Sequence, residues 1–170
     1  FNAQLNYRIN SFRRFTLDSS VEFISSDFTN LLGMNEEERS LNILYEINTV
    51  EDYRNPSNGY FIAFRPSLIG TILGGERDYF KFQLIIKNYK KITNESIIAF
   101  RFKFGYINNF NKSMGLLPYH KFKLGDQTTL RGWKTPQEYE GKDVSSQPNG
   151  ALIYDMLNIE YRYIIYKNLG

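Results

Sequence analysis

The sequence predicts an all-β fold, an antiparallel up-and-down sheet that forms a section of a transmembrane β-barrel. Aromatic residues make up 16% of the chain, apolar and polar residues alternate in seven segments, and connections between these segments are alternately short and long. Aromatic side chains suit a pleated surface, and a period of two residues is that of a strand. This pattern leaves little room for helix.

The first three segments each have one apolar and one polar face. In residues 1–9 every odd position is apolar and every even position is polar, and the same alternation returns in residues 15–23 and 41–47. We therefore expect three strands here. The charged run at residues 36–39 lies before the third segment and is predicted to belong to a solvated loop, with a short helical turn as the alternative.

Four further segments repeat the alternation, in residues 60–68, 80–87, 98–106 and 153–163. In the second of them, Phe80, Phe82 and Leu84 alternate with Lys81 and Gln83. Each segment is therefore predicted to be a strand with one wet face.

The connections predict how the strands follow one another. Short turns are expected near residues 11–13, 55–58 and 91–95, and longer loops at about 26–40, 69–77 and 107–150. Short turns on one rim and long loops on the other are typical of outer-membrane barrels.

The charges indicate which face meets water. Full charges stand inside the strands on the polar face, which a watery lumen accepts and a sandwich core does not: Glu46, Lys81, Lys87, Arg101, Lys103, Glu160 and Arg162. The other face is apolar over about 9–11 residues, enough for a tilted strand to cross a bilayer. A soluble β-sheet binding module would also alternate and stays an alternative.

Seven strands are too few to close a membrane barrel. Bacterial barrels usually have an even number of strands from about eight upward, and an open edge in lipid costs several kcal/mol per unpaired backbone group. Residues 1–170 are therefore predicted to be a partial transmembrane β-barrel domain, one section of a larger barrel.

Composition excludes several function classes. The chain has no Cys, one His and a net charge of +3, which argues against a disulfide scaffold, a zinc site and a nucleic-acid partner. We find no catalytic constellation, so we expect no enzyme, cofactor or metal. His120 is predicted to make a hydrogen bond within a loop.

One motif carries a resemblance to a known family. Its residues stand in the longest loop: Phe122, Gly125, Asp126, Leu130, Arg131, Gly132 and Trp133. Their spacing resembles the signature of the bacterial surface-antigen superfamily, the BamA- and TamA-type outer-membrane assembly barrels. Asp126 departs from it, because the family has a second Gly there. Asp tolerates a positive φ better than most residues, though less well than Gly.

Two flanking segments support the resemblance. Residues 52–59 resemble the family's Asp-x-Arg…Pro-x-x-Gly periplasmic turn, and residues 158–162 resemble the strand after the motif loop, whose Glu faces the lumen. The resemblance implies that the chain runs from about the sixth to the twelfth strand of a barrel of about sixteen. It also implies that the loop at about 107–150 folds back into the lumen.

The function that the resemblance implies is insertion of β-barrel proteins, or secretion, at the bacterial outer membrane, without nucleotide or metal. The implied partners are the lipid bilayer, unfolded outer-membrane proteins or a secreted substrate, the remaining barrel strands, periplasmic repeat domains and accessory lipoproteins. A passive porin and a mitochondrial or plastid outer-membrane location stay open. So does the choice among an insertase, a TamA-like factor and a two-partner secretion transporter.

The motif predicts a latch. A guanidinium that enters a narrow lumen needs a carboxylate partner, and Glu160 on the lumen-facing side of the last strand is the candidate for Arg131. Asp126 is a second possible partner. Gly132 allows a sharp turn after which Trp133 can wedge against the wall. The alternative is a solvated Arg131 without a fixed partner.

Overall fold

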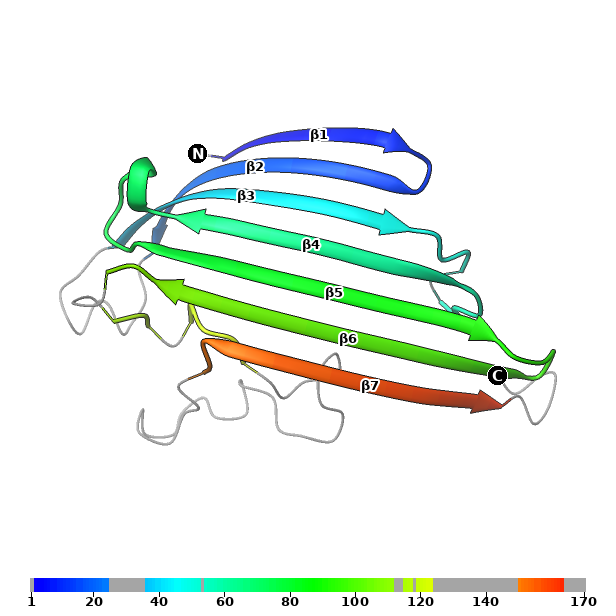
Figure 1. Cartoon of the computed structure of the whole chain (residues 1–170). Helices are drawn as coiled ribbons and strands as arrows, with labels where there is room; N and C mark the ends of the chain where they lie inside the picture. The colour runs from blue at the N-terminus through cyan, green and yellow to red at the C-terminus, as the bar shows by residue number, and fades with distance from the viewer. Residues whose placement is uncertain are drawn as a thin grey trace.

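Seven strands form one antiparallel sheet in chain order. The computed structural model describes residues 2–24, 36–52, 54–111, 115–117, 119–123 and 150–163. Its strands are β1 (Asn2–Asn10), β2 (Arg13–Ile24), β3 (Glu36–Asn48), β4 (Gly59–Ile69), β5 (Tyr79–Lys91), β6 (Ser96–Asn109) and β7 (Ile153–Tyr163) (Figure 1). Only a short 3-10 turn, η1 (Thr71–Leu73), interrupts this pattern within the described residues. The predicted all-β, up-and-down antiparallel fold is confirmed.

The register keeps the two predicted faces separate across the whole sheet. Leu84 of β5 lies opposite Phe64 of β4 and Phe104 of β6. Lys87, three positions along the strand, lies on the other face and opposite Arg101. Because side chains alternate along each strand, apolar positions pair with apolar positions and charged positions share the opposite face. We call these the outer and the inner face.

The outer face leaves large apolar side chains uncovered. Tyr7 is 62% exposed, Leu157 58% and Ile159 71%. Soluble monomers rarely expose a contiguous apolar surface of this kind. Tyrosines near strand ends stand on the same face, where aromatic side chains of membrane barrels meet the lipid headgroups: Tyr7, Tyr60, Tyr106 and Tyr163. The outer face is therefore suited to lipid.

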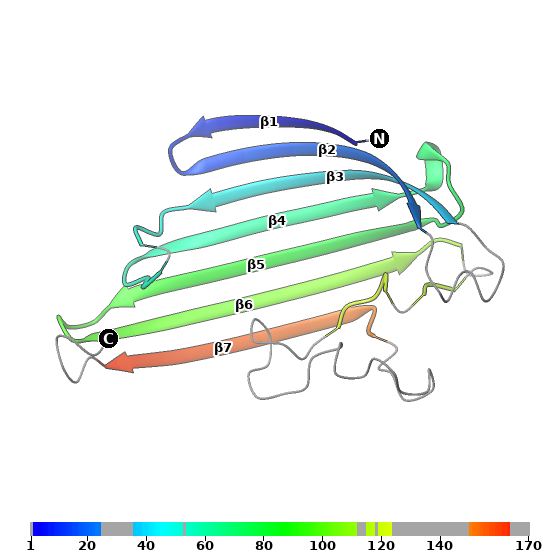
Figure 2. The same ribbon diagram turned by 180° about the vertical axis from the view of Figure 1, so that it is seen from behind.

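The sheet is curved and open. β1 and β7 lie at its two margins in both views (Figure 2). Within the described residues no other strand pairs with either of them, so the sheet does not close. None of the described helical segments is long and apolar enough to cross a membrane.

The connections differ in part from the prediction. β1–β2 and β5–β6 are joined by residues 11–12 and 92–95, as expected, but β3–β4 is joined by residues 49–58, a span similar to the 70–78 connection. The connection between β3 and β4 is therefore longer than the turn expected at residues 55–58. The ladder ends early because the Thr49 side chain takes part in it: the Tyr60 N–H donates to Thr49 Oγ1 at 2.9 Å. Gly59, at φ +105°, makes this close approach possible.

The prediction of a solvated loop at residues 36–39 is wrong, because β3 begins at Glu36. The backbone of this segment pairs with the β4–β5 connection. The Gly70 N–H donates to the Arg39 carbonyl at 2.9 Å, and the Glu76 N–H donates to the Glu37 carbonyl at 3.2 Å. These bonds hold the charged run extended.

The β6–β7 connection also differs slightly from the prediction. It spans residues 110–152 rather than 107–150.

Candidate functional site

The two ends of the β6–β7 connection meet at one point. The Phe122 N–H donates to the Ala151 carbonyl at 3.0 Å, and the Ala151 N–H donates to the Phe122 carbonyl at 2.9 Å. This small antiparallel bridge places Phe122 just before β7 begins. The described start of the loop is thus tied to its end.

Phe122 packs against the inner face. It is 8% exposed and forms an apolar cluster with Ile69, Tyr79 and Ile107. Its ring centroid lies 4.7 Å from that of Tyr154 on β7. Gly105 provides the space for these rings, because a Cβ there would lie 2.2 Å from Tyr154 Cε1 and 2.7 Å from Phe122 Cζ. The motif phenylalanine is therefore seated on the sheet.

His120 is the polar centre of the same contact. It is 3% exposed, and its Nδ1 accepts a hydrogen bond from the Leu117 N–H at 3.1 Å. Because Nδ1 accepts, Nε2 carries the proton of the neutral ring and donates to Glu38 of β3. The predicted hydrogen bond of His120 within the loop is confirmed by the bond to Leu117. Glu38, on a strand distant in sequence, supplies a second partner.

Two cations complete the attachment. Lys81 Nζ of β5 donates to the His120 carbonyl at 3.0 Å and lies 4.9 Å from the centroid of the Phe122 ring. Arg77, which is 5% exposed, donates to the Gly115 carbonyl. We call these residues the loop anchor: Glu38, Arg77, Lys81, His120 and Phe122. They attach the loop to β3, β5, β6 and β7 on the inner face.

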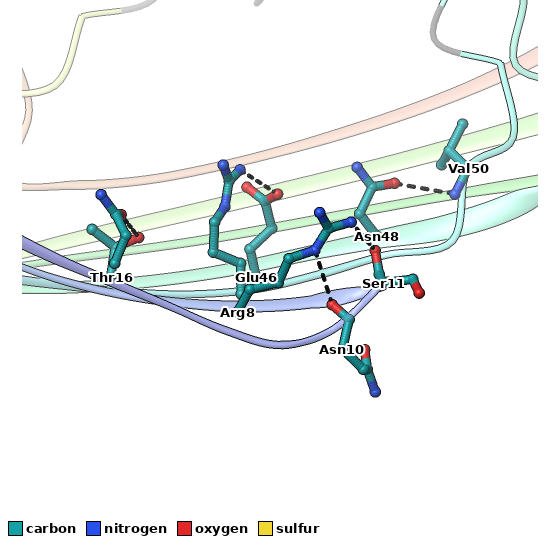
Figure 3. Close-up of polar contacts among 9 residues, drawn as sticks. Arg8, Asn10, Ser11, Thr16, Glu46, Asn48 and Val50 are labelled. Atoms are coloured by element: carbon teal, nitrogen blue, oxygen red, sulfur yellow. Dashed lines mark hydrogen bonds and ion pairs between the residues drawn. The ribbon is translucent and has the colours of Figure 1, made fainter.

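Ion pairs cover the rest of the inner face near its margins. Arg14 of β2 and Glu46 of β3 lie 2.8 Å apart, and Arg162 and Glu160 of β7 lie 3.0 Å apart. Figure 3 shows Thr16 and Glu46 on the same side of their strands, with dashed bonds to their neighbours. Charged side chains therefore stand on the inner face near both of its margins, as predicted.

The structure describes two of the predicted site residues. Phe122 is in the loop anchor, and Glu160 is on the inner face of β7, where it pairs with Ala99 and accepts hydrogen bonds from Arg162. Phe122 packs near the start of β7, so the two are not neighbours. The remaining motif residues lie outside the described residues, and the Arg131 latch stays a prediction: Gly125, Asp126, Leu130, Arg131, Gly132 and Trp133.

Sequence reasoning missed three members of the loop anchor. Glu38 was placed in a loop, while Arg77 and Lys81 were not assigned to any site. The available signal was His120, two residues before the motif phenylalanine and surrounded by no sequence-local carboxylate. A polar aromatic side chain that becomes buried needs partners from elsewhere. Among the described residues, no three His, Asp or Glu side chains gather closely enough to hold a metal ion.

This geometry defines the class of protein. A curved antiparallel sheet with an apolar outer face, a charged inner face and a loop bound to the inner face is the wall of a transmembrane β-barrel. Residues 2–169 match the Omp85 superfamily domain, and the chain therefore belongs to the Omp85 superfamily. No curated protein matches the chain. Members of the superfamily are non-enzymatic outer-membrane proteins that assemble or translocate other proteins.

Proposed function

We propose that residues 1–170 form the central wall of a BamA- or TamA-like barrel that inserts β-barrel proteins into the bacterial outer membrane. In this proposal, unfolded outer-membrane proteins are the substrate. Periplasmic repeat domains and accessory lipoproteins deliver them, and the remaining strands close the barrel. The observation that carries the proposal is the loop anchor, which holds the start of the β6–β7 loop against the inner face.

The loop anchor supports a plug rather than a surface loop. Its contacts come from inward positions of β3, β5 and β7, which supports a loop that leaves the sheet on the lumen side. We propose that residues 124–149 continue across the lumen and that Arg131 reaches Glu160. Glu160 is on the inner face, and a carboxylate can accept from more than one guanidinium although Arg162 already binds it.

Assembly assays on the full-length protein test this function. Reconstituted into vesicles, it should fold an outer-membrane substrate faster than vesicles alone, and Arg131→Ala should slow that folding, because the plug loses a charge-assisted bond. Lys134→Ala, three residues away in the same loop, is the matched control and should keep full activity. An active Arg131→Ala variant with an equally protected loop would remove the latch from the proposal.

The same preparation separates the porin alternative. A passive porin would conduct ions across a planar bilayer and leave the rate of substrate folding at the level of empty vesicles. An insertase raises that rate whether or not it conducts. Ion conductance without any folding activity would therefore contradict the proposed function.

A further inference from the structure

The middle of the inner face carries charges of one sign only. β4, β5 and β6 contain no Asp or Glu anywhere along their lengths. Besides Lys91 at the last position of β5, their inward positions hold five cations: Arg65, Lys81, Lys87, Arg101 and Lys103. We call these five residues the cationic tract. Since the outer face of the same strands carries no charge except Lys90 near the end of β5, the charge is concentrated on the side that faces the lumen.

The register places these cations against one another. Lys87 lies directly opposite Arg101 on the inner face. Like charges directly opposite each other destabilise a sheet. In addition, Arg65 Nε is buried and has no hydrogen-bond partner among the described residues. A negative group on the tract would relieve both the repulsion and the unpaired donor.

Two inward carboxylates on the adjoining strands are paired with arginines. Glu46 of β3 binds Arg14, and Glu160 of β7 binds Arg162. Within the tract, Arg101 Nε donates to the neutral amide oxygen of Asn158 at 3.2 Å. Lys81 is already held in the loop anchor, so the part of the tract that a negative ligand would meet is the positive charge around Lys87, Arg101 and Arg65.

The shape of the tract fits an extended chain. Lys81 and Lys87 are separated by about 20 Å along β5, at about 3.4 Å per residue, so a small anion cannot span them. Small residues stand between the cations and leave room above the backbone. Ala63 and Ala99 are inward, as is Gly105. The surface is thus a low, positively charged wall with cations spaced along it.

We propose that the cationic tract binds an acidic segment of an unfolded polypeptide inside the barrel. Carboxylates spaced along an extended chain complement cations spaced along three strands, and water-exposed side chains can exchange such contacts quickly. The proposal rests on the proposed function for the origin of that polypeptide, a substrate on its way into or across the membrane. The binding of an acidic segment itself depends only on the charges of the cationic tract.

Fluorescence anisotropy tests the binding on the full-length protein in detergent micelles. A labelled Glu-rich peptide should bind at low salt and dissociate as salt rises, whereas a Lys-rich peptide of equal length should not bind. The double substitution Lys87→Gln with Arg101→Gln should weaken binding about tenfold, because each carboxylate contact loses its partner charge. Folding of the variant is checked by its gel shift on heating. Lys90→Gln, an exposed cation on the other face near the end of β5, is the matched control and should leave the affinity unchanged.

Photo-cross-linking locates the bound peptide. A photoreactive residue at inward Gln83 should capture the acidic peptide, and the same residue at outward Leu84 should not. Equal capture at both sites, equal binding of the basic peptide, or full affinity in the double variant would overturn the proposal. The proposal would also be overturned if the double substitution changed only the permeability of the barrel to small anions. Loss of assembly activity with acidic-peptide binding intact would instead count against the proposed function alone.

Discussion

At the scale of single residues, His120 shows how a buried polar group can locate a loop. Both of its ring nitrogens are bonded, one to the Leu117 backbone and one to Glu38 on a strand more than eighty positions away. Burying either group without the other would leave a polar atom unpaired, at a cost of about 1–3 kcal/mol. The pair therefore favours one position of the start of the β6–β7 loop over others.

Glu38→Ala tests this pair. The substitution leaves the buried His120 Nε2 without its acceptor, so the loop anchor should weaken by about 1–3 kcal/mol. Proteolysis within residues 110–152 of the folded barrel should become faster, which mass spectrometry of the fragments measures. Glu37→Ala is the control, because the Glu37 side chain pairs with the half-exposed Arg39 at 2.8 Å and such pairs contribute less than about 1 kcal/mol. Equal cleavage of the two variants would contradict the role given to Glu38.

Gly105→Ala tests the seat of Phe122. The added Cβ would collide with the rings of Tyr154 and Phe122, at 2.2 and 2.7 Å, and such overpacking costs about 1–3 kcal/mol. We expect a lower midpoint for unfolding in urea together with a loosened loop. Gly115→Ala, where no atom of the described residues apart from its chain neighbours lies within 4 Å of the added Cβ, should change neither. A stable Gly105→Ala barrel would mean that the two rings can move aside at little cost.

At the scale of an element, β5 shows how one strand can face lipid on one side and water on the other. Its outward positions carry Phe80, Phe82 and Leu84, and its inward positions carry Lys81 and Lys87. A shift of register by one residue would exchange these sets and put charges into lipid. The burial of one face and the hydration of the other therefore determine the register together.

A pair of neighbouring substitutions in β5 tests the two faces. Leu84→Arg puts a guanidinium on the outer face near the middle of the strand and should destabilise the barrel in lipid by about 2–4 kcal/mol. Gln83→Arg, one residue away on the inner face, should cost much less because water reaches it. Reversible refolding into vesicles measures both free energies. A Gln83→Arg cost equal to that of Leu84→Arg would mean that the inner face is also dry.

At the scale of the whole molecule, the open margins are the dominant feature. β1 and β7 each have one side with no partner strand among the described residues, and a strand edge is a template for another strand. In lipid, unpaired backbone groups are costly, so these edges must be covered. The architecture is therefore that of a wall that depends on further strands.

Expression of residues 1–170 alone tests this dependence. We expect the isolated chain to associate with itself through its edges, because each unpaired backbone group in an apolar surrounding costs several kcal/mol. Light scattering after chromatography in detergent should show oligomers, whereas the full-length protein should be monomeric in the same detergent. A monomeric, protease-resistant chain of residues 1–170 would show that it satisfies its edges by itself.

The sequence by itself determined the strands, their two faces and the family, because alternation records which solvent each face meets and the motif around Phe122 is specific. It did not determine the extension of β3 to Glu36 or the end of β3 near Thr49, since both depend on bonds to segments that are distant in the chain. Only the tertiary structure joined His120 to Glu38 and Lys81. A buried polar side chain takes whichever partner the packed sheet brings to it, and local sequence does not contain that information.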